Sequence, residues 1–179
     1  MQATGHAGEE GRLRARIDVG GTGRASVEIG IPLFDHLLAL LAQHASFDLA
    51  LEVAPGEAGA EISAAGRALG RALEQPLRAP GARGHGSAAV PADDALAHVA
   101  LEASGRPLVV SNADLSQSRV GGLSSNVVAS FLEELARGAG LTLHVRLIHG
   151  DDAEHVLQAI FKALGVALAQ ACRPRTKEE

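Results

Sequence analysis

Apolar residues recur along this chain with two different periods, which predict strands and helices in succession. Residues 10–19 alternate charged and apolar side chains, and 25–31 form a second β-type run after a Gly-rich turn, so the two predict a hairpin. A stripe of leucines predicts a helix over 33–45, opened by Pro32. The same reasoning predicts strand 47–53, helix 60–75, strands 87–90, 96–102 and 108–113, helix 124–138, strand 141–148 and helix 153–171.

Two stretches of the chain repeat one order of elements. Residues 34–75 and 131–170 each read as helix, strand, short loop and long apolar helix, at an offset of 94–97 residues, and both end in the pattern Ala-Leu-Gly-x-Ala-Leu-x-Gln. The chain is therefore expected to be a tandem duplication. The boundaries expected from this pattern are a disordered N-terminus at 1–9, a first half-domain at 10–86, a second at 87–172 and a C-terminal tail at 173–179.

Composition supports a globular, oligomeric protein. Of the 179 residues 46% are hydrophobic, yet Trp and Tyr are absent and only four are Phe, so the core must be built from Ala, Leu and Val. Such a core would gain from burial against other subunits. The net charge of −5 gives no reason to expect a nucleic acid or a membrane as partner. The single Cys172, the absence of a membrane-length apolar run and a polar start predict a cytoplasmic protein.

Histidines are the candidate ligands. His36 and His44 lie eight residues apart in the first predicted helix, and His155 opens the last one behind an acidic turn. Imidazoles on helices are common metal ligands. Taken singly, however, each is more often an ordinary core or surface histidine than a ligand.

Several motifs keep the order and spacing of one enzyme family. They are Phe34-Asp35-His36-Leu37-Leu38 with His44, Val90-Pro91-Ala92-Asp93-Asp94-Ala95-Leu96-Ala97, Ser104-Gly105-Arg106-Pro107, Leu141-Thr142-Leu143-His144, Phe161-Lys162-Ala163 and Thr176-Lys177. Together they resemble imidazoleglycerol-phosphate dehydratase, the manganese-dependent lyase of histidine biosynthesis. The resemblance implies an α/β (α+β) fold of the ribosomal S5 domain 2-like type. Each half would then pack a mixed sheet on two helices, with the helices of both halves meeting in the middle.

The resemblance also shows where the metal-binding motifs have changed. The family's first H-H-T-V-E motif falls on 59–63, its second H-H-x-x-E motif on 154–158, and a further family histidine on Ser130. Of the eight implied ligands only His36 and His155 remain, with Glu154 as a candidate substitute. Two ligands cannot displace enough of the water around manganese, so little or no manganese is expected. The family's dehydration reaction is accordingly expected to be impaired or silent.

The positions implied to contact substrate are better kept. They are Glu10, His44, Arg106 and Lys177, with a further phosphate-binding arginine expected near Arg83. These side chains predict a phosphorylated small molecule as ligand, because guanidinium and ammonium groups bind phosphate oxygens.

Two further hypotheses remain open at this stage. One is an active dehydratase that binds metal through other ligands, with Glu61, Glu154, His85 or His149 as candidates. The other is a non-catalytic structural or regulatory subunit that assembles with an active relative. In all cases the resemblance implies a homo-oligomer, a trimer or larger and up to the family's 24-subunit shell.

Overall fold

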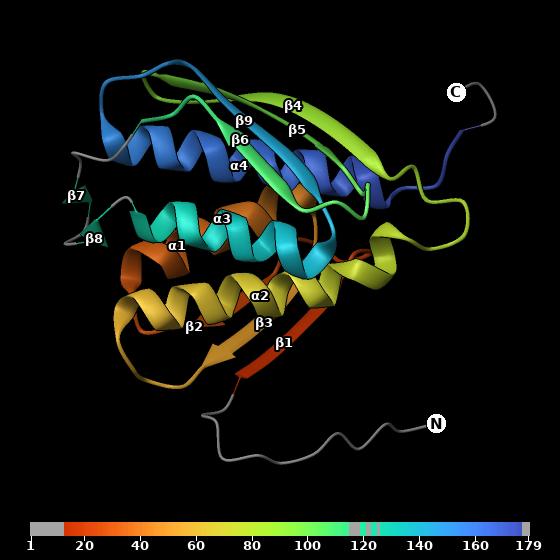
Figure 1. The fold of residues 1–179 in the computed structure, drawn as a ribbon, viewed down its shortest axis with the longest axis horizontal. Helices are drawn as coiled ribbons and strands as arrows, with labels where there is room; N and C mark the ends of the chain where they lie inside the picture. Colours follow the sequence, from red (N-terminus) through yellow and green to blue (C-terminus); the bar gives the residue numbers. More distant parts are fainter. Residues whose placement is uncertain (1–12, 115–118, 121–122, 125, 177–179) are drawn as a thin grey trace.

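The structure, a computed structural model, describes residues 13–114, 119–120, 123–124 and 126–176. Two β-sheets form the outer layers and helices fill the space between them (Figure 1). The first half contains β1 (Leu13–Asp18), β2 (Ala25–Glu28), α1 (Pro32–Ala45), β3 (Asp48–Val53) and α2 (Ala58–Leu77). The second contains β4 (His85–Ala92), β5 (Ala95–Glu102), β6 (Leu108–Ser111), β7 (Arg119–Val120), β8 (Leu123–Ser124), α3 (Asn126–Ala139), β9 (Thr142–His149) and α4 (Ala153–Cys172).

The predicted hairpin between the first two strands is wrong. Strand β3 lies between them, antiparallel to β1 and parallel to β2. The connection between β1 and β2 crosses the start of β3, where Asp48 Oδ1 accepts hydrogen bonds from the backbone N–H groups of Thr22 and Arg24 at 2.9 and 3.0 Å. An alternating pattern shows which face of a strand is buried, but it does not show which strand lies beside it.

The second sheet repeats this arrangement with one strand added. Its order is β4-β5-β9-β6, and β9 is antiparallel to β5 and parallel to β6, as β3 is to β1 and β2. Helices α1 and α3 each have 14 residues, and α2 and α4 each have 20. The duplication and the fold predicted from the sequence are therefore confirmed.

The structure corrects the register of the duplication in its first helix. The turns after α1 and α3 match, because Phe47 N donates to Ala42 O as Leu141 N donates to Ala136 O. This match makes Phe131 the counterpart of Leu37, whereas matching the repeats by sequence pairs it with Phe34. Residues three apart lie on nearly the same face of a helix, so the hydrophobic pattern alone tolerates this shift.

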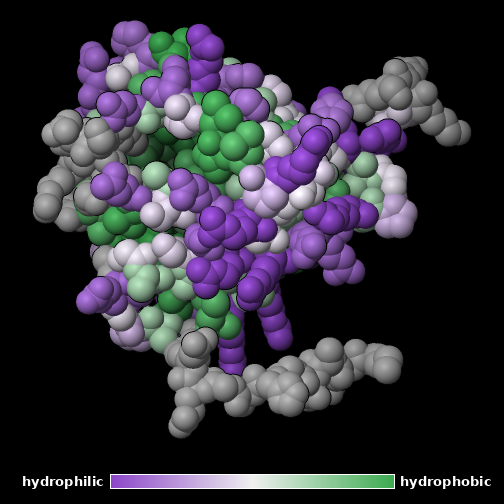
Figure 2. Space-filling model, in the orientation of Figure 1, coloured by the Kyte–Doolittle hydropathy of each residue, from purple (hydrophilic) through white to green (hydrophobic). Residues whose placement is uncertain are grey.

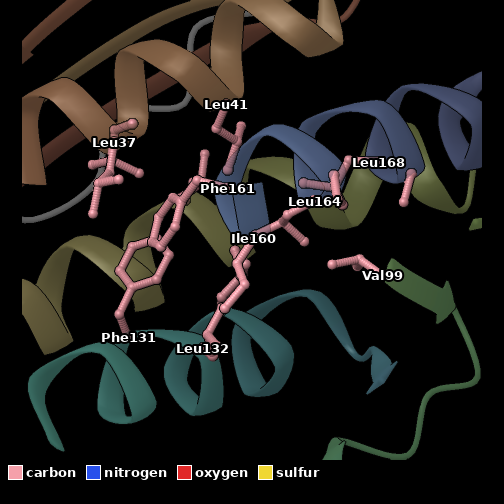
Figure 3. Close-up of a cluster of buried hydrophobic side chains, with 14 of the residues drawn as sticks. Leu37, Leu41, Val99, Phe131, Leu132, Ile160, Phe161, Leu164 and Leu168 are labelled. Carbon is pink, nitrogen blue, oxygen red and sulfur yellow. The ribbon is translucent and has the colours of Figure 1, made fainter. Parts of the chain in front are cut away.

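One core joins the two halves. Helix α2 packs on α3 and α1 packs on α4, so each half buries its helices against the other. Phe34 contacts Phe131 and Phe161 edge-on, with ring centroids 5.2 and 5.8 Å apart. Figure 3 shows Phe161 between Leu37 and Phe131, with the leucines of α1 and α4 continuing the cluster. Among the described residues, α4 alone is long and apolar enough to cross a membrane, but 67% of that stretch is buried, which is typical of a core helix.

The connection between the halves is shorter than predicted. Helix α2 continues to Leu77, past the predicted end at 75, and includes Pro76. Strand β4 begins at His85, within the predicted connector 76–86. The N-terminal segment 1–9 and the last three residues of the predicted tail lie outside the described residues.

Candidate functional site

The helices run in one direction, so their N-termini lie at one end of the molecule and their C-termini at the other (Figure 1). On α2, Gly66 lies against the backbone of Phe131 and Gly70 against that of Leu135, so the residue numbers of α2 and α3 increase together. Leu37 and Leu41 on α1 advance across Figure 3 in the same direction as Phe161, Leu164 and Leu168 on α4. The four starts of the helices therefore share one end.

The positions implied to bind metal all lie at this N-terminal end. His36 is on α1 and its counterpart on α3 is Ser130. At the start of α2 and α4, Gly59 corresponds to Glu154, Ala60 to His155 and Ser63 to Gln158. Each half thus keeps one histidine, and the two histidines do not occupy equivalent positions. Among the described residues, no three His, Cys, Asp or Glu side chains are arranged to hold a metal ion.

His155 is enclosed by carboxylates. Its Nδ1 lies 2.6 Å from Asp94 Oδ1, and its Nε2 lies 3.4 Å from Asp93 Oδ2. Asp152 caps α4 by accepting hydrogen bonds from the N–H groups of Glu154 and His155 at 2.9 and 3.1 Å. The helix start and the β4–β5 turn are therefore joined by this imidazole and by the Asp151 N–H, which donates to Asp94 Oδ2 at 3.1 Å.

These contacts change the proton affinity of both partners. The hydrogen bond from the Asp151 N–H, followed by the bond to His155, lowers the pKa of Asp94 to about 2. The hydrogen bond to Asp94 is in turn the main cause that raises the pKa of His155 above its ordinary value. A protonated imidazole has no lone pair to offer a metal ion, so these carboxylates disfavour ligation by His155 in the geometry observed. Two acidic turns next to the strands that lead to this contact are a partial signal in the sequence, but they do not reveal which residues pair.

The other candidate ligands make contacts of their own. Glu61 is buried, and its Oε1 accepts a hydrogen bond from the Gly56 N–H. His149 Nδ1 lies 3.0 Å from the Asp94 carbonyl oxygen, whereas Glu154 Oε1 accepts a bond from Gln158 at 3.4 Å. His85 begins β4, about 25 Å of strand away from the β4–β5 turn. His85 is thus too distant to join His155 in one metal site.

The opposite end of the helices carries arginines. Arg106 lies in the β5–β6 turn, where its N–H donates to Ser104 Oγ at 3.0 Å and its carbonyl accepts from Thr142 Oγ1 at 3.1 Å. The Arg78 guanidinium lies against Gly105 and Gly140 beside this turn. The C-terminal stretch also reaches this end, because Arg83 N donates to Arg173 O at 2.7 Å and Arg175 N to Gly81 O at 2.9 Å. These five side chains, Arg78, Arg83, Arg106, Arg173 and Arg175, are called the arginine end below.

The remaining substrate-contact predictions are only partly described. His44 is half-buried in the last turn of α1, and its Nδ1 donates to the Leu40 carbonyl at 2.9 Å. It therefore lies at the C-terminal end of the helices, as the arginines do. Glu10 and Lys177 lie outside the described residues.

The positions implied to bind metal and the arginine end are separated by the length of the helices. Helix α4 has 20 residues and is therefore about 30 Å long. A metabolite-sized ligand is much shorter than this. A site that uses both ends must therefore combine them from two chains.

Comparison with known proteins decides the family. Residues 29–168 match the family model described as imidazoleglycerol-phosphate dehydratase. The chain belongs to this family. It is 36% identical over 169 residues to the imidazoleglycerol-phosphate dehydratase of Pelobacter propionicus, covering 92% of this chain and 86% of that one. It is 38% identical over 162 residues to that of Acetivibrio thermocellus, covering 88% and 83%.

Solved structures of imidazoleglycerol-phosphate dehydratases share the fold. The Staphylococcus aureus enzyme superposes with a TM-score of 0.84 at 29% identity, covering 92% of this chain and 95% of that one. The Pyrococcus furiosus enzyme, crystallised with (S)-C348, gives a TM-score of 0.83 at 25% identity, covering 95% and 93%. The resemblance seen in the sequence is thus confirmed.

Proposed function

We propose that this chain is an imidazoleglycerol-phosphate dehydratase-like protein whose dimanganese site is degenerate, and which dehydrates the substrate weakly or not at all. This proposal rests on the amino acids found at the starts of the helices. Gly59, Ala60 and Ser63 offer no imidazole or carboxylate, and the same is true of Ser130 and Gln158. The surviving pair, His36 and His155, comes from two non-equivalent positions.

Loss of these groups removes two parts of the chemistry. A metal pair stabilises the negative charge that develops when a proton leaves carbon, and such stabilisation is worth several kcal/mol. The glutamates of both motifs, replaced by Ser63 and Gln158, would otherwise be candidates for moving that proton. Neither a serine hydroxyl nor an amide is a base near neutral pH.

Binding of a phosphorylated small molecule is proposed for the arginine end. Arg106 is exposed and held by its backbone, so its guanidinium is available for a bidentate contact with phosphate oxygens. Because the two ends lie on opposite sides of the subunit, a homo-oligomer of three or more chains is the state in which such a ligand could meet the helix starts of a neighbour.

A second candidate function rests on the geometry around His155. A carboxylate on Nδ1 is the usual outer-shell partner that orients a metal-bound histidine, and Asp94 holds this place. Asp93 Oδ2 faces Nε2 of the same imidazole. A divalent ion bound at Nε2 would therefore balance the negative charge of these carboxylates. An active dehydratase with a single ion bound there is the alternative, and its relatives' names favour activity.

Metal analysis and complementation separate the two. The protein is produced in a host that lacks its own dehydratase gene, so that no host enzyme contaminates the assay. The proposal expects less than one manganese per chain after incubation with excess metal, and no growth of that host without histidine. One bound ion per chain, with growth that is lost on substituting His155→Ala, would establish the alternative, and two ions per chain would contradict both.

A further inference from the structure

A hollow of about 690 Å³ lies on the outer face of the first sheet, which points away from the helices. Its floor is formed by Ala50 on β3 and Ser26 on β2, which lie opposite each other. Leu49 and Leu51, on either side of Ala50, are buried on the inner face, so the sheet lies between this hollow and the helices. Figure 2 shows hydrophilic side chains that stand away from the lower side of the molecule, where Figure 1 places β1 and β3.

Two walls of opposite charge border this floor. Arg14 and Arg16 on β1 form one wall, and Glu52 on β3 and Glu28 on β2 form the other. The register places Arg14 opposite Glu52 and Glu52 opposite Glu28, so these three form one row across the sheet. Arg16 begins the next row, which the floor completes. Two strand spacings separate the Cα atoms of Arg14 and Glu28 by about 10 Å.

The four charges of the hollow are not paired with one another. Within the part of the chain that the structure describes, no ion pair or side-chain hydrogen bond involves Arg14, Arg16, Glu28 or Glu52. Two carboxylates directly opposite each other, as Glu28 and Glu52 are, destabilise a sheet. A cationic group bound between them would remove this repulsion, and an anionic group would do the same for the two arginines.

The duplicate positions of the second sheet carry different side chains. His144 is the counterpart of Ala50, so a ring stands where the first sheet has a methyl group. Arg146 is the counterpart of Glu52 and reverses its charge. The shared backbone therefore requires neither the small floor nor the row of mixed charge, and both are features of the first half alone.

We propose that this hollow binds a free α-amino acid. Its ammonium group lies between Glu28 and Glu52. Its carboxylate faces Arg14 and Arg16, and its side chain lies over the floor. The spacing of about 10 Å between the walls is sufficient for the charged head of an amino acid with a hydrogen bond of about 3 Å at each end. A simple anion or cation is attracted by one wall and repelled by the other, so the hollow selects molecules that carry both charges.

Valine is the probe, and each of its two controls lacks one charge. 3-Methylbutanoate has no ammonium group, and isobutylamine has no carboxylate. Binding is followed on the purified, assembled protein by methyl NMR of Ala50 and Leu13, which both line the hollow. We expect saturable shifts with valine, and shifts about fivefold smaller with either control at the same concentration.

Variants test the walls and the floor. Arg16→Gln should weaken valine binding about three- to fivefold, as expected for an exposed charge pair. Glu52→Arg introduces the residue of the duplicate position, so it should abolish valine binding and increase that of 3-methylbutanoate. Ala50→His fills the floor and should abolish the shifts of Leu13. Glu102→Gln, which removes a carboxylate from the second sheet, is the control and should change nothing.

Three results would overturn the proposal. One is the absence of saturable shifts up to the solubility limit of valine, as when a neighbouring subunit covers this face. Another is equal binding of valine and either control, which would exclude recognition of both charges. The third is unchanged valine binding by folded Glu52→Arg or Ala50→His protein, which would place the ligand elsewhere.

Discussion

Gly165 on α4 lies against the carbonyl group of Leu41 on α1, and its duplicate Gly70 on α2 lies against the carbonyl of Leu135 on α3. A Cβ atom on either glycine would overlap the backbone oxygen of the facing helix. Both helix crossings thus depend on a missing side chain, and the same contact is built twice. A backbone carbonyl cannot rotate away as a flexible side chain can, so these positions are sensitive to substitution.

Gly165→Ala should destabilise the protein by about 1–3 kcal/mol, because overpacking at the crossing exceeds the gain of up to about 1 kcal/mol in helix propensity. Gly59→Ala is the matched control, since open space surrounds a Cβ atom there. It should leave the free energy of unfolding unchanged or slightly higher. Urea denaturation followed by circular dichroism measures both. Equal midpoints for the two variants would show that the helices can separate at little cost.

The contribution of His155 to stability should depend on pH. Its pKa is raised in the folded state, so its contribution is complete below the ordinary value of 6.5 and is lost as the pH rises through the raised value. Asp94 has its pKa lowered from 3.8 to about 2, so its contribution is complete above 3.8 and is lost as the pH falls towards 2. The pair therefore stabilises most between about pH 4 and 6.5.

His155→Gln should accordingly lower the melting temperature more at pH 5.5 than at pH 9. His36→Gln serves as control, because His36 is exposed on α1 and should matter little at either pH. Thermal melts at the two pH values give the comparison. An equal loss for His155→Gln at both would mean that the ion pair with Asp94 contributes nothing.

Restoring the lost ligands should restore metal binding. The changes are Gly59→His, Ala60→His, Ser63→Glu, Ser130→His, Glu154→His and Gln158→Glu. With neutral imidazoles and carboxylates at all the implied positions, manganese should rise from below one to about two ions per chain. Elemental analysis after gel filtration tests this. Restoring only the first-half positions is the control, and it should bind less.

The assembly should not depend on metal. With few aromatic residues and a second sheet that exposes Leu108, Val110 and Ile148, the chain retains apolar surface to bury between subunits. We expect a homo-oligomer, a trimer or larger, whose mass by light scattering is the same with and without EDTA. A monomer at micromolar concentration contradicts the first expectation, and dissociation in EDTA contradicts the second.

Phosphate binding should require Arg106. Arg106→Gln should weaken the binding of glycerol phosphate about tenfold, because a charge-assisted bidentate contact is lost, and Arg106→Lys should recover only part of it. Arg14→Gln, an exposed arginine on the other sheet, is the control. Calorimetric titration gives the affinities. Unchanged binding by Arg106→Gln would assign the ligand to other residues.

The sequence predicted most helices and strands because the apolar periods of α1 to α4 are long and regular. It failed where position depends on distant residues. The place of β3 between β1 and β2 is set by pairing across the sheet, and the Asp94–His155 contact joins segments far apart in the chain. Pro76 was read as the end of α2 because proline disfavours helix interiors, yet the helix continues one residue past it.

The separation of the helix starts from the arginine end also determines what this chain could contribute to an oligomer assembled from this chain and an active relative. Where a relative with intact ligands supplies the helix starts and this chain supplies its arginines, the shared site would contain every group it needs. Where this chain supplies the helix starts and the relative supplies the arginines, the site would hold the phosphate without the metals. Substituting one protomer would therefore inactivate only the sites to which it gives its helix starts, and a particle with both kinds of subunit would lose activity in proportion to its composition.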